Sequence, residues 1–312
     1  MRQPEVARLT ALVLALVLVV PVARAGSSAL LALAFLVEFL TPERSRALST
    51  LTAPPERRPF LVPGASADLY VRAGLSGGAP LVLVHGFAPD GKDDPRVREA
   101  AALLSRAGFD VAVPTIPGLT HGRLGVDDIE PVVAALAARA APTVVVGVSV
   151  GAGPALLAAA EPRVRDRVRV ALILGGYASA SEVVRFWLTG AYGYEGIRGR
   201  VDHDPELVRQ FVGANADRLA APPADLQRYL DALSPLRVAR DIPARVILVH
   251  GRADRAVPYT ESLRLADARP ERTKLVLVGV VGHVEGAGAR GWRDARDFLA
   301  LWLVMYGLLS DR

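Results

Sequence analysis

The sequence predicts an α/β fold in which helices flank a mostly parallel β-sheet. Eight short apolar runs recur along the chain, and the last six lack the apolar–polar alternation of half-exposed strands. Runs of that kind are typical of strands buried on both faces. Helical patterns lie between several of the runs, and this order implies right-handed βαβ crossovers. The 312 residues are 51% hydrophobic and 22% charged, which is ample for a large core.

The elements of the sheet domain are expected in a simple order. The strands are expected at residues 60–62, 68–72, 81–84, 111–114, 144–146, 170–174, 246–249 and 275–280. The helices are expected at residues 94–107, 126–140, 154–160 and 292–309. Because parallel strands all point the same way, loops that follow them are expected to meet at one edge of the sheet.

One interval, at about residues 178–243, interrupts this alternation. It shows no convincing strand and contains helical stretches at 181–188, 205–213 and 224–233, together with the aromatic residues Trp187, Tyr192 and Tyr194. An insertion at the carboxyl end of a strand lies where such sheets bind ligands. The alternative interpretation is a peripheral helical subdomain that only adds stability.

The N-terminus carries the pattern of an export signal or an anchor. Arg2 and Arg8 precede an aliphatic run at 9–22, and Ala23-Arg24-Ala25 follows as a small-x-small site. We therefore expect residues 1–25 to be a signal peptide or membrane anchor and residues 26–58 to be an apolar segment and linker. The resulting localisation is exported or membrane-anchored. The alternative is a cytoplasmic protein whose apolar N-terminal helix packs on its own core.

Charge and composition argue against several classes of partner. The net charge is +5, but only two of the 37 basic residues are lysines, and the arginines are scattered singly among acids. No run of basic residues alternates with aromatics, so nucleic-acid binding is not expected. The chain has no cysteine, which excludes disulfides and thiol chemistry. No Glu-x-x-His grouping occurs, so neither a metal nor another cofactor is expected.

The most informative motif is Gly147-Val-Ser149-Val-Gly151, which lies between a β-branched run and a helix former. This is the pattern of a nucleophile elbow, a sharp strand-to-helix turn that exposes the serine hydroxyl. Glycine is expected at positions 147 and 151 because a side chain there would collide with a neighbouring strand or helix. Taken alone, Ser149 could instead be an ordinary turn serine.

Two later strands supply the partners that a serine nucleophile needs. The run at 246–249 leads into a loop with Asp254, and the run at 275–280 leads into Gly282-His283. Serine, then aspartate, then histidine is the order expected for this type of fold. A catalytic histidine removes the serine proton and a carboxylate orients it. Individually, Asp254 could cap a turn or helix and His283 could be a core histidine, but together they predict a triad.

An acyl-transfer reaction also needs two donors for its oxyanion. The backbone N–H of Val150, directly after the nucleophile, is one candidate. The backbone N–H of Phe87, after the strand end at His85-Gly86, is the other. His85 and His250 both stand at strand ends, and we interpret them as structural residues that take no part in the chemistry.

These motifs resemble those of the α/β-hydrolase family across residues 59–309. The segments that carry the resemblance are residues 85–87, 114–118, 147–151, 250–258 and 282–283. The resemblance implies a hydrolase domain at 59–312 with a mostly parallel eight-stranded sheet and a helical cap inserted after strand six. It also implies Ser149 as the nucleophile, His283 as general base and then acid, and Asp254 as the orienting carboxylate. Thr115 stands where many members carry aspartate, so the subfamily stays open.

The predicted function is that of a serine hydrolase, carboxylesterase-like or lipase-like. It would cleave carboxylic ester or thioester bonds of a small apolar substrate through an acyl-enzyme, near a membrane surface. A serine at position 149 disfavours relatives that open epoxides or displace halide with a carboxylate. A serine peptidase or amidase and an acyltransferase are alternatives on the same fold. A non-catalytic, membrane-tethered binding module is an alternative of another class, and the oligomeric state stays open.

Overall fold

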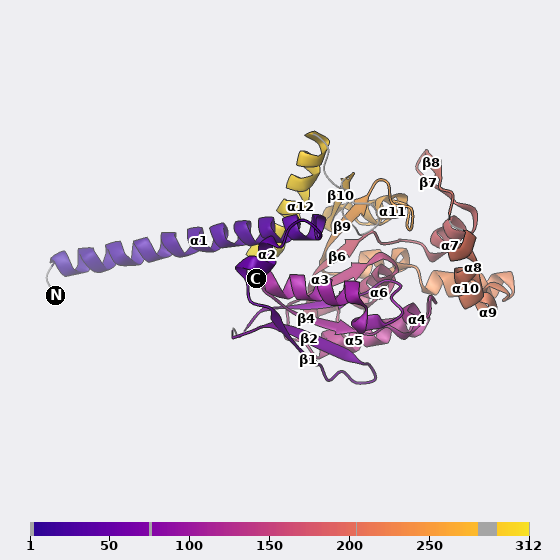
Figure 1. Cartoon of the computed structure of the whole chain (residues 1–312), viewed down its shortest axis with the longest axis horizontal. Helices are drawn as coiled ribbons and strands as arrows, with labels where there is room; N and C mark the ends of the chain where they lie inside the picture. The colour runs from indigo at the N-terminus through magenta and orange to yellow at the C-terminus, as the bar shows by residue number, and fades with distance from the viewer. Residues whose placement is uncertain (1–2, 75–76, 204, 280–291, 312) are drawn as a thin grey trace.

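The computed structural model describes residues 3–74, 77–203, 205–279 and 292–311 (Figure 1). Its centre is an eight-stranded sheet with the order β1-β2-β4-β3-β5-β6-β9-β10. All neighbouring strands pair in parallel except β1 with β2 and β2 with β4. The strands are β1 (Pro55–Pro59), β2 (Ala67–Arg72), β3 (Ala79–Val84), β4 (Phe109–Pro114), β5 (Thr143–Val148), β6 (Val168–Leu174), β9 (Arg245–Gly251) and β10 (Thr273–Val278). The predicted mostly parallel α/β sheet is therefore confirmed.

Helices cover both faces of this sheet and create two cores. One face packs against α5 (Ile129–Ala137), α6 (Ala152–Ala160) and α11 (Thr260–Ala268). The other packs against α3 (Pro95–Arg106), α12 (Trp292–Ser310) and the last third of α1 (Gln3–Leu40). Adjacent strand residues such as Val144 and Val145 enter opposite cores, which explains why the central strands are apolar without alternation.

The first strand lies earlier than predicted. Residues 60–62 were expected as a strand from their apolar character, but the structure forms β1 at Pro55–Pro59. β1 is an edge strand paired only with β2, and its polar side chains face outward or bind charges. Arg57, for example, donates to the Asp68 carboxylate over 2.7 Å. An edge strand of this composition carries no apolar run, so a search for such runs misses it.

The segment inserted after β6 forms a cap at one end of the molecule (Figure 1). Its helices are α7 (Ala180–Thr189), α8 (Pro205–Ala214), α9 (Ala216–Leu219) and α10 (Pro223–Ala232). It also contains a hairpin of β7 (Ala191–Tyr194) and β8 (Ile197–Arg200), which the sequence did not predict. Glu195 and Gly196 turn this hairpin at φ values of 45° and 81°, as a two-residue hairpin loop requires.

The N-terminal apolar segments form one continuous helix instead of two. α1 runs without a break through Ala23–Ala25, and its first half projects away from the body of the molecule (Figure 1). Its second half docks on α12, where Ser28 Oγ donates to the Leu309 carbonyl and Trp302 Nε1 donates to the Ala29 carbonyl. Within the described part of the chain, residues 22–40 are long and apolar enough to cross a membrane, although 28% of that segment is buried in the protein.

The remaining helices are short. α2 (Ala47–Leu51) follows α1, and Glu38 accepts hydrogen bonds from the backbone and the hydroxyl of Ser49 there. α4 (Pro117–Thr120) follows β4. Short 3-10 helices lie at Gly91–Asp93, Val126–Asp128, Ser149–Gly151, Arg165–Arg167, Pro235–Asp241 and Pro270–Arg272.

Candidate active site

Ser149 lies at the turn between β5 and α6, at the carboxyl edge of the sheet. Its φ is 54°, in the left-handed region that a residue with a side chain rarely adopts. A backbone of this kind costs roughly 1–3 kcal/mol and persists only where the surroundings impose it. The strained turn that the Gly-x-Ser-x-Gly pattern describes is thus present at this serine.

The glycines around the turn lie against other backbone. A Cβ added to Gly151 would lie 2.3 Å from the His85 carbonyl oxygen, and one added to Gly147 would lie 2.8 Å from Ala155 Cβ. Gly86, at the end of β3, is equally close to the serine, because a Cβ there would lie 3.1 Å from Ser149 Cβ. The turn is therefore clamped between β3 and α6 at distances that only glycine permits.

Asp254 lies in the loop that follows β9 and is 6% exposed. Its Oδ1 accepts hydrogen bonds from the backbone N–H groups of Ala256 and Val257, at 2.8 and 2.9 Å. Hydrogen bonds to an ionised carboxylate favour the charged form and fix its orientation. The loop therefore presents a buried, oriented carboxylate at the same edge of the sheet as Ser149.

His250 braces this loop from the strand side. Its Nε2–H donates to the Val257 carbonyl at 3.0 Å, and the same nitrogen lies 3.3 Å from Asp254 Oδ2. Its Nδ1 accepts from the Ser262 hydroxyl at 2.7 Å, because the other nitrogen carries the ring proton. Both ring nitrogens of this buried histidine are engaged in holding the loop, which agrees with a structural role.

His85 has a comparable place on the other side of the site. Its Nδ1–H donates to the Gly86 carbonyl at 2.7 Å, and its Nε2 accepts from the Ile116 N–H at 3.0 Å. Burial lowers the pKa of this histidine, so the ring is neutral around pH 7. It ties the end of β3 to the chain that follows β4 and so positions the loop carrying Phe87.

The two candidate oxyanion donors flank Ser149. Val150 is the next residue along the chain and is buried in the 3-10 helix that begins at the serine. Phe87 follows Gly86, which is in contact with the serine, and its ring packs on Trp187 of the cap at a centroid distance of 5.9 Å. The structure therefore brings the segments that carry Phe87 and Val150 close to Ser149.

His283 falls in residues 280–291, outside the described residues. The strand that precedes it, β10, pairs in parallel with β9, with Val278 beside Gly251. The chain therefore leaves β10 at the edge that carries Asp254 and Ser149. The role of His283 remains a prediction from the sequence.

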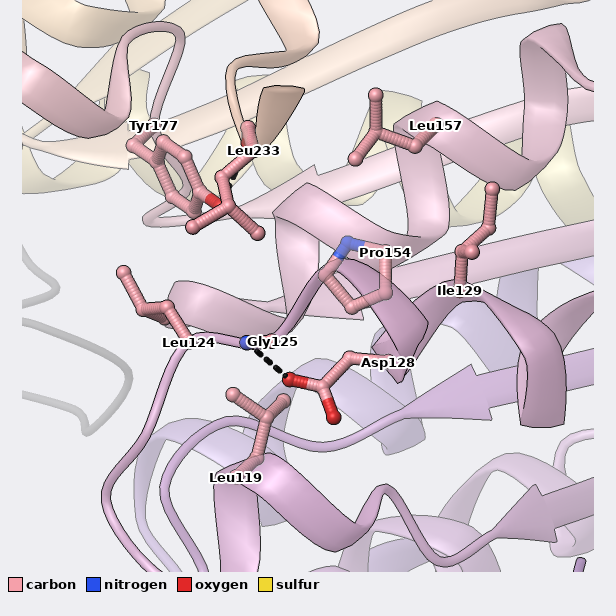
Figure 2. Close-up of a pocket in the computed structure, with 9 residues that line it drawn as sticks. All are labelled: Leu119, Leu124, Gly125, Asp128, Ile129, Pro154, Leu157, Tyr177 and Leu233. Atoms are coloured by element: carbon pink, nitrogen blue, oxygen red, sulfur yellow. Dashed lines mark hydrogen bonds between the residues drawn. The ribbon is translucent and has the colours of Figure 1, made fainter. Parts of the chain in front are cut away.

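Sequence reasoning missed a buried carboxylate beneath the cap. Asp128 lines a small cavity of about 10 Å³, about the volume that holds one water (Figure 2). Its two oxygens accept from the backbone N–H groups of Gly118 and Gly125, at 2.9 and 2.8 Å. Burial raises the pKa of this aspartate. The cavity is otherwise lined by Leu119, Leu124, Ile129, Pro154, Leu157, Tyr177 and Leu233.

Asp128 joins the two ends of the loop formed by residues 118–125 through its hydrogen bonds to Gly118 and Gly125. We call this loop the docking strap, because it contacts the cap. Asn215 Nδ2 donates to the Gly122 carbonyl at 3.0 Å. Arg123 forms an ion pair with Asp217, and the Tyr229 hydroxyl donates to the Leu124 carbonyl. Three consecutive strap residues thus each hold one element of the cap, a pattern that depends on partners distant in sequence.

Within the part of the chain that the structure describes, no group of three or more histidine or carboxylate side chains is placed to hold a metal ion. The described site consists of the strained Ser149, the buried carboxylate of Asp254 and the segments that carry the candidate donors Phe87 and Val150.

Comparison with known proteins bears on the family and the fold of the chain. The model of the family described as "Alpha/beta hydrolase family" matches residues 81–300. The curated protein 2-hydroxymuconate semialdehyde hydrolase of Pseudomonas sp. (strain CF600) is 30% identical over 255 residues, covering 72% of this chain and 87% of that protein.

Solved structures show the same fold at lower identity. Pyrococcus horikoshii acylaminoacyl peptidase superposes with a TM-score of 0.59 at 15% identity over 83% of this chain, which spans only 42% of that peptidase. The 2,6-dihydroxy-pseudo-oxynicotine hydrolase superposes with a TM-score of 0.54 at 20% identity, over 85% of this chain and 70% of that one.

Proposed function

The chain belongs to the alpha/beta hydrolase family, and from that premise we propose that it is a serine hydrolase that cleaves carboxylic ester or thioester bonds. The observation that carries this proposal is the strained backbone of Ser149, with φ 54°, at the turn where β5 meets α6. A turn serine without a chemical role has no need of a conformation that costs free energy. The buried carboxylate of Asp254 at the same edge supports the proposal.

The mechanism assigns one step to each residue. Ser149 Oγ attacks the ester carbonyl carbon while His283 accepts the serine proton, and Asp254 orients the imidazole and stabilises its charged form. The N–H groups of Val150 and Phe87 donate to the oxyanion of the tetrahedral intermediate. His283 then returns its proton to the leaving alcohol, and an acyl-enzyme remains. Water, deprotonated by His283, then attacks the acyl carbon, and His283 returns this proton to Ser149 Oγ as the acid leaves, which regenerates the free serine and the neutral histidine.

The surroundings of the site favour an apolar substrate. The aromatic rings of Phe87, Trp187 and Phe211 form a continuous set, with centroid distances of 5.9 and 4.6 Å between neighbours. All three side chains are only partly buried, so part of this apolar surface is open. A carbon chain attached to the reacting carbonyl would bind more tightly by covering such a surface, because burial of apolar surface is favourable.

The test is hydrolysis of short nitrophenyl esters by the whole chain and by Ser149→Ala. The variant is expected to lose hydrolysis and labelling by a fluorophosphonate probe together, because both need the serine oxygen. Ser27→Ala is the matched control, since Ser27 is exposed on α1 and bonds only to the Arg24 carbonyl. Retained hydrolysis in Ser149→Ala would refute the mechanism.

A second candidate rests on the curated relative. Its name assigns it 2-hydroxymuconate semialdehyde, and 30% identity over 87% of its length favours a related substrate for this chain. Peptide bonds are a further candidate on the same triad. Comparing esters, anilides and 2-hydroxymuconate semialdehyde as substrates separates the three. The ester proposal is abandoned if either of the other compounds has the highest kcat/KM.

We also propose that α1 anchors the enzyme in a membrane. The helix has 38 residues, and its first half, which contains the aliphatic run at 9–22, projects from the body. Val22–Leu40 also has the length and composition of a span, but its later part packs on α12. The test is fractionation of expressing cells followed by an alkaline wash of the membranes. An integral anchor keeps the chain in the pellet, and release into the supernatant contradicts the proposal.

A further inference from the structure

A single cap side chain contacts both loops that would carry the chemistry. Trp187 lies near the end of α7, the first helix of the cap. Its indole Nε1–H donates to the Ala256 carbonyl at 2.7 Å, and its ring packs on Phe87. Ala256 is two residues beyond Asp254, and Phe87 is three residues beyond the end of β3.

On the acid side, the Trp187 hydrogen bond completes the fixation of one peptide segment. The N–H of Ala256 is held by Asp254 Oδ1 at 2.8 Å, and its carbonyl is held by the indole. The next carbonyl, that of Val257, accepts from His250 Nε2. A histidine of the sheet therefore fixes one end of this segment and a tryptophan of the cap fixes the other.

On the oxyanion side, the same ring supports a residue next to the nucleophile. Gly86 approaches Ser149 so closely that a Cβ would lie 3.1 Å from the serine Cβ, and Phe87 follows directly. The Phe87 ring meets Trp187 at 5.9 Å, and Trp187 meets Phe211 of α8 edge-on at 4.6 Å. The tryptophan thus joins a cap helix to the loop that carries the candidate oxyanion donor.

We propose that Trp187 is a positioning and specificity residue of this site. Its N–H holds the loop that orients Asp254, and its ring forms the apolar wall against which the substituent of the substrate carbonyl packs. This inference rests on the proposed ester hydrolysis. It assigns separate functions to the indole N–H and to the ring of Trp187. The donor acts on the reaction through Asp254, and the ring acts on binding through contact with the substrate.

Two substitutions separate these functions. Trp187→Phe keeps an aromatic ring beside Phe87 and removes the donor, whereas Trp187→Ala removes both. Trp302→Phe is the matched control, because Trp302 also donates its indole N–H to a backbone carbonyl, that of Ala29, at 3.1 Å. This contact joins α12 to α1, away from the cap. The full-length chain is assayed with nitrophenyl esters of increasing acyl length across a pH series, and fluorophosphonate labelling of Ser149 is measured alongside.

The expected results differ for each variant. Trp187→Phe is expected to lower kcat about tenfold for every ester. This factor corresponds to the loss of one hydrogen bond that stabilises the transition state. The substitution also moves the acid limb of the kcat/KM profile to lower pH, because a loosened Asp254 stabilises the imidazolium less. Its KM still falls with each added methylene by roughly three- to fourfold, as apolar burial predicts. Trp187→Ala loses this dependence on acyl length as well, and Trp302→Phe matches the parent chain in all readouts.

Other outcomes separate failure of this inference from failure of the proposed function. A parent chain that is labelled and active, with Trp187→Phe unchanged in kcat and pH profile, overturns the positioning role. Trp187→Ala with undiminished dependence on acyl length overturns the specificity role. A parent chain that neither reacts with the fluorophosphonate nor cleaves any ester overturns the proposed function, and this inference falls with it.

Discussion

The catalytic edge of the sheet and the cap above it are held in position by different kinds of interaction. At the edge, Ser149 is fixed by close packing, since a Cβ added to Gly151 would lie 2.3 Å from the His85 carbonyl oxygen and one added to Gly147 would lie 2.8 Å from Ala155 Cβ. The cap is fixed by side chains that reach across to backbone groups. The position of Ser149 is therefore set by the elements on either side of it, whereas the contacts of the cap can be altered one at a time.

The cap contacts come from three places around its base. The docking strap holds the turn between α8 and α9, α9 itself and α10 through Gly122, Arg123 and Leu124, respectively. Glu261 of α11 accepts from the N–H groups of Ala178 and Ser179, where the chain enters the cap. Trp187 holds the acid loop. Because each contact is separate, substitutions are expected to have graded effects in the cap and abrupt ones at the edge.

The largest effect is expected from Gly151→Ala at the edge. The new Cβ would lie 2.3 Å from the His85 carbonyl oxygen and 2.8 Å from the Val84 carbonyl oxygen, so β3 and the nucleophile turn must separate. Overpacking of this kind costs about 1–3 kcal/mol or more, and we expect loss of activity with it. Urea unfolding and ester hydrolysis measure the two effects.

The matched control is Gly213→Ala in α8 of the cap. A Cβ there meets nothing within 4 Å, and alanine is the better helix former. Its free energy of unfolding is expected to rise by up to about 1 kcal/mol. Equal destabilisation by the two substitutions would remove the contrast between the edge and the cap.

An intermediate effect is expected from Asp128→Asn beneath the strap. Asparagine keeps one acceptor oxygen, so the N–H of either Gly118 or Gly125 loses its partner. An unsatisfied buried donor costs about 1–3 kcal/mol in the free energy of unfolding. The measurement is urea unfolding of the parent chain and the variant side by side. An unchanged unfolding midpoint would show that the two hydrogen bonds to Asp128 do not stabilise the fold.

The difference in stability between the parent chain and Asp128→Asn is expected to depend on pH in a defined direction. Burial raises the pKa of Asp128 in the folded protein, so the folded state binds the proton more tightly than the unfolded state. The stability linked to this proton is present below the ordinary pKa of aspartate and is lost as the pH rises through the raised value. The parent chain should therefore exceed the variant by more at about pH 4 than at about pH 7. If the difference in the free energy of unfolding between the parent chain and Asp128→Asn is smaller at pH 4 than at pH 7, the pKa of Asp128 is not raised in the folded protein.

The smallest effect is expected from Asp217→Asn in α9, where Asp217 pairs with Arg123 of the strap. Asp217 is exposed and pairs with Arg123, which lowers the pKa of its carboxyl. Exposed ion pairs are screened by water and salt, so the midpoint of urea unfolding should not move measurably. The remaining strap contacts, made by Gly122 and Leu124, should still hold the cap. A large loss of stability would show that the cap depends on this one contact.

The sequence was informative where function depends on strand order and local pattern. Ser149 and Asp254 follow apolar runs, so their places at one edge could be predicted from the parallel sheet. β1 escaped prediction because a polar edge strand has no apolar run, and the β7–β8 hairpin because its turn uses Glu195 in a left-handed backbone. Ala256, the hydrogen-bond partner of Trp187, lies 69 residues away along the chain, and the cap partners of Gly122 and Leu124 lie 93 and 105 residues away, so only the folded structure brings them together.

The continuous helix α1 has a consequence for how the enzyme would meet its substrate. A helix of 38 residues is about 57 Å long at 1.5 Å per residue, nearly twice the hydrocarbon thickness of a bilayer. Its free end and the cap lie at opposite ends of the molecule (Figure 1). In the anchored enzyme that we propose, α1 is therefore a stalk that turns the catalytic edge toward the water. Substrate would arrive from solution and not from the lipid phase.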